Sequence, residues 1–332
     1  MRERAMLVFS DGARSMIASR TEPAADARRR VFLARSAAAV VGAVLPAARA
    51  EEPLLFHDHG HGLAFSPEGR ALLVPSERGV AAYDEGVWWR AAGPAQGFSA
   101  FAVTEEGLYA SGHARAGARA RPFGLAHSTD GGRTWRVLAL AGEADLHLLA
   151  AGYRSGALYV LSALPGPRMA AGALYATFDR GRTWRRAAAQ GLVGEIHGLA
   201  AHPDAARTLA AATGRGLYLS RDGGESFARV DDADAATAVA FDLGGERLRY
   251  ARAASTEILQ IGVDGAARPA LRLPPLPGDY VTCLAQSPVD ARVLAFATRR
   301  RDIYLTGDGG STWRPIATRG APRGTGAQPG AR

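Results

Sequence analysis

The sequence contains no lysine: all 40 basic residues among its 332 are arginines, and the formal net charge is +8. Arginine would suit dense binding of phosphates or carboxylates, because its guanidinium group binds them through two parallel hydrogen bonds. Nucleic-acid binding requires basic residues gathered on one face, whereas here they are scattered along the chain. The abundant alanine and glycine indicate codon bias in a GC-rich gene instead, so we expect no nucleic-acid partner.

Long apolar runs and cysteine pairs are also missing. The single cysteine, Cys283, excludes an internal disulfide. The run from Ala37 to Leu45 is too short to anchor the chain in a bilayer, but it follows three arginines and precedes a small-residue site at Ala48 and Ala50, which is the layout of a signal peptide. The start of this segment resembles a twin-arginine export signal. We therefore expect residues 1–50 to be an extension with such a signal, and the mature protein to be periplasmic or secreted with no membrane span.

The remaining chain is a repeat. Six segments open with a similar short strand, such as HGLAFSP at His61 and HGLAAHP at His197. A second strand, a third strand and a turn follow, and no sustained helical period occurs. Four short strands every 40 to 50 residues or so are typical of a β-propeller blade. The sequence predicts an all-β, six-bladed β-propeller over residues 51–318, followed by a disordered tail rich in glycine, proline and arginine over 319–332.

A glycine-rich motif falls between the third and fourth predicted strands of most blades. Its glycines permit the positive φ of a tight turn, and its aspartate can accept backbone N–H groups of the same turn. A degenerate copy, AYDEGVWW, is present in the first blade, and the fifth blade has no copy. We call the four clear copies the box turns: STDGGRTW (128–135), TFDRGRTW (177–184), SRDGGESF (220–227) and TGDGGSTW (306–313).

The box turns resemble the Asp-box, or BNR repeat, of sialidases, sortilin-type receptors and the photosystem II assembly-factor family. The resemblance implies a sialidase-like propeller in which the boxes lie on the rim opposite the ligand. It extends to exported bacterial proteins labelled glycosyl hydrolases because of their BNR repeats, through stretches such as HGHGLAF and EADLHLLA. We therefore expect the box turns to have a structural role and not to form the functional site.

Candidate functional residues stand at or just before the predicted starts of the inner strands and, for His113, at the end of a second strand, on the face away from the box turns. Imidazoles gathered there would suit Zn²⁺ or another divalent metal, and the acids two residues earlier could be ligands or could orient the imidazoles. The alternative is that these polar groups merely line a wet channel. The predicted metal-binding set comprises His59, His61, His113, His147 and His197, and the predicted acids are Asp145 and Glu195.

Three functions remain open from the sequence. The first is an exported propeller that binds a small molecule, a glycan, a metal or a protein partner at the channel face without catalysis. The second is a glycoside hydrolase that uses Asp145 and Glu195 as its carboxylates, although the RIP-like motif of sialidases is missing from the mature chain. The third is a scaffold similar to the photosystem assembly factors, with Arg299, Arg300 and Arg301 as its dense basic segment.

Overall fold

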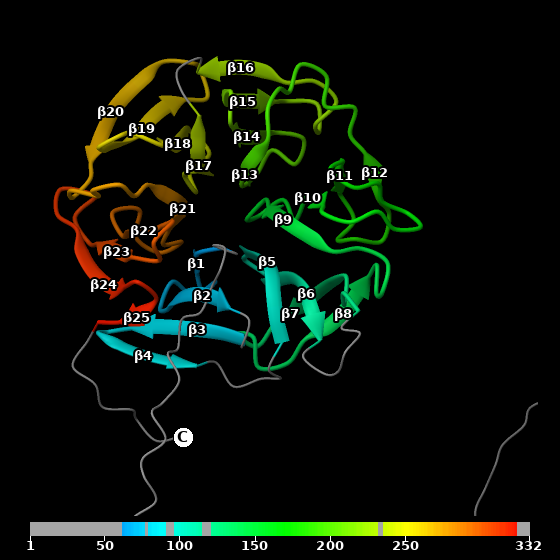
Figure 1. Cartoon of the computed structure of the whole chain (residues 1–332), viewed down its shortest axis with the longest axis horizontal. Coiled ribbons are helices and arrows are strands. Elements are labelled where there is room, and N and C mark those ends of the chain that lie inside the picture. The colour runs from blue at the N-terminus through cyan, green and yellow to red at the C-terminus, as the bar shows by residue number, and fades with distance from the viewer. Residues whose placement is uncertain (1–61, 77–78, 91–95, 115–120, 232–234, 324–332) are drawn as a thin grey trace, which may run out of the picture. The chain divides into compact units, whose positions relative to one another are not determined.

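The structure is a computed structural model that describes residues 62–76, 79–90, 96–114, 121–231 and 235–323. All of these belong to the unit formed by residues 51–332. The described residues form six β-sheets arranged in a ring (Figure 1), and none of them is helical. This confirms the predicted all-β, six-bladed propeller. No helix in this part of the chain could cross a membrane, and the predicted signal segment lies outside the described residues.

Each blade is one antiparallel sheet of consecutive strands, ordered from the channel outwards. The first three blades are β1 (Ala64–Phe65), β2 (Leu72–Ser76), β3 (Gly79–Asp84) and β4 (Val87–Arg90); β5 (Gln96–Thr104), β6 (Gly107–Ala114), β7 (Leu125–Ser128) and β8 (Arg136–Ala139); and β9 (Leu146–Ala151), β10 (Leu158–Ser162), β11 (Leu174–Thr177) and β12 (Arg185–Arg186). The next two are β13 (Ile196–Ala201), β14 (Leu209–Thr213), β15 (Gly216–Ser220) and β16 (Ala228–Asp231); and β17 (Ala236–Phe241), β18 (Arg247–Arg252), β19 (Glu257–Gly262) and β20 (Ala267–Arg272).

The sixth blade contains five strands, namely β21 (Val281–Gln286), β22 (Leu294–Thr298), β23 (Ile303–Thr306), β24 (Arg314–Thr318) and β25 (Ala321–Pro322). Because β25 pairs with β24, the sheet continues beyond residue 318, where the sequence placed the end of the propeller. Residues 324–332 of the predicted tail lie outside the described part of the chain.

The hydrophobic core is divided into six clusters, and each cluster lies between two neighbouring blades. A blade is therefore covered on both faces, which explains why strands such as β14, with the sequence LAAAT, are buried at every position. The ring is closed by side chains of the first and last blades, since each described sheet uses only consecutive strands. There the Trp88 indole N–H donates to the Ile316 carbonyl at 2.9 Å.

The box turns connect β7 to β8, β11 to β12, β15 to β16 and β23 to β24, as the repeat predicts. In the first of them, the Asp130 carboxylate accepts the Thr134 backbone N–H at 2.9 Å and the Thr134 hydroxyl at 2.6 Å. The Ser128 hydroxyl accepts the Gly132 N–H at 2.9 Å and donates to Asp130 at 2.8 Å. The same bonds recur in the other three turns, centred on Asp179, Asp222 and Asp308.

Candidate functional site

The inner strands of the blades begin at one end of the channel, opposite the box turns. His147 and His197 are the second residues of β9 and β13, and therefore stand at equivalent positions of neighbouring blades. His113 reaches the same end from β6, where it pairs with Gly97 near the start of β5. Three of the five predicted histidines thus lie at this end of the propeller. His59 and His61 lie outside the described residues.

The structure brings three of the predicted residues together with one that the sequence reasoning left out. Asp145 precedes β9, and its side chain is 5% exposed. Its Oδ2 atom lies 3.0 Å from His147 Nε2 and 3.7 Å from His113 Nε2, while its Oδ1 atom accepts the Ser99 hydroxyl at 3.2 Å. We call Ser99, His113, Asp145 and His147 the Asp145 cluster. Ser99 could have been found from the sequence, because it opens the repeated segment SAFAVTE in the second blade as His147 opens HLLAAGY in the third.

Partners from two blades hold the buried carboxylate. A buried charge is costly unless it is paired and hydrogen-bonded, and here Ser99 and His113 come from the second blade while His147 comes from the third. Because a carboxylate can only accept, the 3.0 Å contact assigns a proton to Nε2 of His147. In neutral His147 the lone pair is then on Nδ1. The His113 nitrogen, at 3.7 Å, is beyond direct hydrogen-bond distance.

The surrounding main chain fixes the position of Asp145. Its own carbonyl accepts the Ala163 N–H at 2.9 Å, from the loop between β10 and β11. That loop is tied to the segment before Asp145 by a two-point ion pair, in which Arg168 donates to the two carboxylate oxygens of Glu143 at 2.6 and 3.1 Å. The segment before β9 and the loop between β10 and β11 therefore hold Asp145 in a fixed position. Such preorganisation lowers the entropic cost of binding a ligand.

The other predicted residues do not join the cluster. His197 places Nδ1 at 2.9 Å from the Ala236 carbonyl, so that nitrogen is the donor and Nε2 carries the lone pair. Glu195 is exposed, and its side chain has no hydrogen-bonding partner among the described residues. No group of three or more His, Cys, Asp or Glu residues in the described ranges is arranged to hold a metal ion. The divalent metal stays a prediction.

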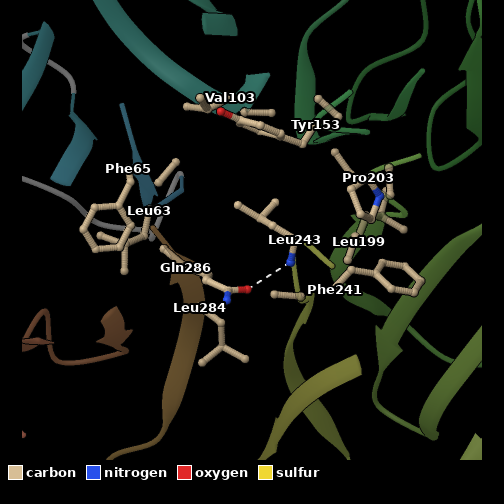
Figure 2. A pocket seen from close by; sticks show the side chains of 18 of the residues that line it. Leu63, Phe65, Val103, Tyr153, Leu199, Pro203, Phe241, Leu243, Leu284 and Gln286 are labelled. Carbon is tan, nitrogen blue, oxygen red and sulfur yellow. Dashed lines mark hydrogen bonds between the residues drawn. The ribbon is translucent and has the colours of Figure 1, made fainter. Parts of the chain in front are cut away.

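At the opposite end of the channel, on the side of the box turns, lies a pocket of about 180 Å³ that the sequence reasoning missed; we call it the apolar pocket because most of its side chains are apolar. Figure 2 shows the ends of the inner strands around it, and none of the described residues that line it is charged. The Gln286 side-chain oxygen accepts the Leu243 N–H at 2.9 Å and the Arg249 guanidinium at 3.0 Å. The pocket could have been predicted from the apolar residues that end or flank the inner strands, such as Leu63, Phe65, Val103, Leu199, Phe241 and Leu284.

Comparison with known proteins supports the fold. Neither the family models nor the curated proteins give a match to this chain. Among solved structures, the chain is similar to the GH74 enzyme of Niastella koreensis, with a TM-score of 0.53 and 14% identity over 78% of this chain and 45% of that one. An ancestral GH74 enzyme has a TM-score of 0.47 and 13% identity over 81% of this chain and 40% of its own. YCF48 bound to a D1 peptide has a TM-score of 0.47 and 16% identity, covering 80% and 83% of the two chains.

The chain thus spans less than half the length of either GH74 enzyme. At 14% identity the likeness to the first enzyme shows a shared propeller fold, because one fold hosts many unrelated functions. The activity of this chain has to be argued from its own side chains.

Proposed function

We propose that the protein is an exported, non-catalytic propeller that binds a polar, hydroxyl-bearing ligand of the glycan class at the Asp145 cluster. One observation carries the proposal: a buried carboxylate holds the Nε2 side of an imidazole that is otherwise 55% exposed to solvent. His147 then offers an acceptor nitrogen, Nδ1, with no partner among the described residues. The box turns, through their resemblance to BNR repeats, support a place among sialidase-like propellers.

A sugar hydroxyl is both a donor and an acceptor of hydrogen bonds, and the cluster matches both properties. Neutral His147 accepts through Nδ1, whereas the same nitrogen donates once the ring is protonated. His113, whose side chain is 37% exposed, adds a second imidazole beside it. Such directional groups in a fixed geometry confer orientation and specificity on a binding site. The apolar pocket at the other end of the channel lacks charged groups of this kind.

Binding is favoured over hydrolysis because of how the carboxylates are used. Most glycoside hydrolases need two carboxyl groups that flank the scissile bond, one as acid and the other as nucleophile or base. The cluster supplies one carboxylate, and both of its oxygens already accept hydrogen bonds from Ser99 and His147. Glu195, the second predicted acid, belongs to the segment before the next inner strand and does not contact the cluster.

The test is ligand-observed NMR of the purified protein with a panel of neutral and acidic oligosaccharides. We expect saturable binding by the wild type, and its loss in His147→Ala and Asp145→Asn. Asp290→Asn is the matched control, because this exposed carboxylate pairs with Arg292 on the box-turn side. Turnover of a glycoside that disappears in Glu195→Gln would favour the hydrolase. Stoichiometric Zn²⁺ binding that requires His147, without glycan binding, would favour the predicted metal site.

Export is a separate part of the proposal and rests on the sequence alone. The basic start before the apolar run motivates it. Replacing Arg29 and Arg30 together with lysine is expected to keep the precursor in the cytoplasm. Undiminished export of that variant would contradict the twin-arginine route.

A further inference from the structure

In five of the six interfaces between blades, an aromatic ring comes from the region between the third and fourth strands of the following blade, or from the start of its fourth strand. In the first blade this is Trp88, whereas the neighbouring Trp89 is 39% exposed. The five rings are Trp88 between blades 6 and 1, Trp135 between 1 and 2, Trp184 between 2 and 3, Phe227 between 3 and 4, and Trp313 between 5 and 6.

The interface between blades 4 and 5 is the exception. Its cluster contains no ring of this kind, because the fifth blade has no box turn. Strands β19 and β20 are instead joined by the short turn Val263–Ala266, in which the Gly265 N–H donates to the Gly262 carbonyl at 2.9 Å. This turn has no aromatic residue to place against the fourth blade.

A groove of about 470 Å³ lies at this interface. A dry cavity of about 150 Å³ lined by similar apolar side chains is large enough to bind benzene, so the groove has room for an indole ring. Arg221 spans one side, where it donates to the Val263 carbonyl at 2.5 Å. The apolar lining comes from both blades and comprises Leu219, Ala228, Val230, Leu248, Ile261 and Val263.

Two of the other interfaces indicate how an indole can be held, whereas the Trp135 N–H donates to the Gly132 carbonyl of its own turn at 3.0 Å. The Trp313 N–H donates to the Arg272 carbonyl at 3.0 Å, at the end of the outer strand β20 of the preceding blade. Trp88 uses the Ile316 carbonyl of β24 in the same way. In the groove the corresponding outer strand is β16, which supplies Ala228 and Val230 to the lining. Four of the five rings are tryptophans, and two of these donate to the outer strand of the preceding blade, which favours tryptophan as the occupant of the groove.

We propose that the groove between blades 4 and 5 binds a tryptophan side chain of a partner polypeptide, in the position that the box-turn rings occupy at the other interfaces. The repeats of the chain itself carry the proposal: five copies of one interface contain a ring supplied by a polypeptide turn, and the sixth has the space without the ring. The site lies between the outer strands and is independent of the Asp145 cluster.

The experiment uses the full chain and two probes, a peptide with the sequence of residues 307–314 (GDGGSTWR) and its tryptophan-to-alanine counterpart. The peptides carry a fluorine label, because the five tryptophans of the protein obscure fluorescence. We expect saturable binding of the tryptophan peptide in ¹⁹F NMR, and affinity at least about tenfold lower for the alanine peptide. Equal affinity of the two peptides, or no saturable binding, would overturn the proposal.

Variants then locate the site. Val263→Trp should fill the groove from within and weaken peptide binding at least about tenfold, while Val289→Trp, at a valine that is 69% exposed outside the groove, should leave it unchanged. Both variants are first checked for wild-type thermal unfolding; if Val263→Trp does not fold, Val263→Ser replaces it, with weaker binding still expected. Unchanged binding in the folded groove variant would contradict the proposal. Equally tight binding of N-acetyl-tryptophanamide would indicate a small-molecule ligand instead of a polypeptide.

Discussion

The carboxylates of the box turns and that of Asp145 each accept a hydrogen bond from a hydroxyl, but their other partners differ in kind and in distance along the chain. In the box turns the aspartate is saturated by a hydroxyl two residues before it and by a hydroxyl and an N–H four residues after it. Asp145 instead accepts the Ser99 hydroxyl from the neighbouring blade and a contact from the His147 imidazole two residues after it, with His113 of the neighbouring blade 3.7 Å away. A carboxylate satisfied locally stabilises its own turn, whereas one satisfied across blades can also hold an exposed imidazole ready for a ligand.

The electrostatics of the two regions differ accordingly. Hydrogen bonds from the Thr134 hydroxyl and backbone lower the pKa of Asp130 to about 2. Equivalent bonds from Thr183 and Ser226 lower the pKa of Asp179 and Asp222 to about 2. These aspartates therefore stay ionised over the physiological range and are unsuited to proton transfer there. The box turns therefore have a structural role, whereas ligand binding at the Asp145 cluster is our proposal, and each of the following experiments tests this difference.

The largest effect is expected for the box-turn ring at the interface between blades 3 and 4. Phe227 is 7% exposed, and Phe227→Ala should lower the free energy of unfolding by about 3 kcal/mol, measured by urea denaturation, because it leaves a cavity. Trp89→Ala, at a ring that is 39% exposed, is the control and should cost less. A loss of ligand binding by folded Phe227→Ala would contradict the purely structural role of the box turns.

A matched pair of carboxylate substitutions separates the two roles directly. Asp222→Asn should cost roughly 1 kcal/mol of stability, because one acceptor of the turn is lost, with ligand binding at the Asp145 cluster unchanged. Asp145→Asn should weaken ligand binding by at least about tenfold. Calorimetry of both variants with the glycan found in the panel provides the measurement. The opposite pattern would show that the box turns are functional.

Acid should destabilise the propeller through the box turns. Because the pKa of these aspartates is lower in the folded state than the value near 3.9 of an unfolded chain, their contribution is complete above about pH 4 and disappears as the pH falls towards 2. Thermal unfolding followed from pH 5 to pH 2 should show a falling melting temperature. The triple variant Asp130→Asn, Asp179→Asn and Asp222→Asn should show a flatter profile, and an unchanged slope would refute this account.

The smallest effect concerns a backbone position within the box turns. Arg180 has a φ of 61°, where the equivalent residues Gly131, Gly223 and Gly309 have φ values of 72°, 82° and 76°. Arg180→Gly should relieve this strain and stabilise the protein by less than about 1 kcal/mol, partly offset by loss of the exposed Glu106 ion pair. Gly131→Arg is the reverse control and should destabilise by a similar amount. Stabilisation by both would contradict the argument.

Features of the fold that depend on contacts between nearby residues could be predicted from the sequence. Four strands per blade followed from the repeat, and the bonds of the box turns followed from residues at most four positions apart. The starts of four inner strands could be placed to within a residue, as for His147 in β9 and His197 in β13, whereas β1 and β5 begin three residues away from the predicted positions. Local geometry is set mainly by φ and ψ preferences and by neighbouring side chains, which the sequence displays directly.

Contacts between blades, in contrast, could be seen only in the tertiary structure. The starts of the inner strands occupy equivalent positions around a ring. Their equivalence in the sequence therefore does not show which of their side chains contact one another. Asp145 points to the second blade and gathers His113 and His147, while Glu195, at the equivalent position, is exposed. The missing box turn of the fifth blade was visible in the sequence. That it leaves a groove was not, because each ring fills the interface with the preceding blade, and packing between blades depends on side chains far apart in the chain.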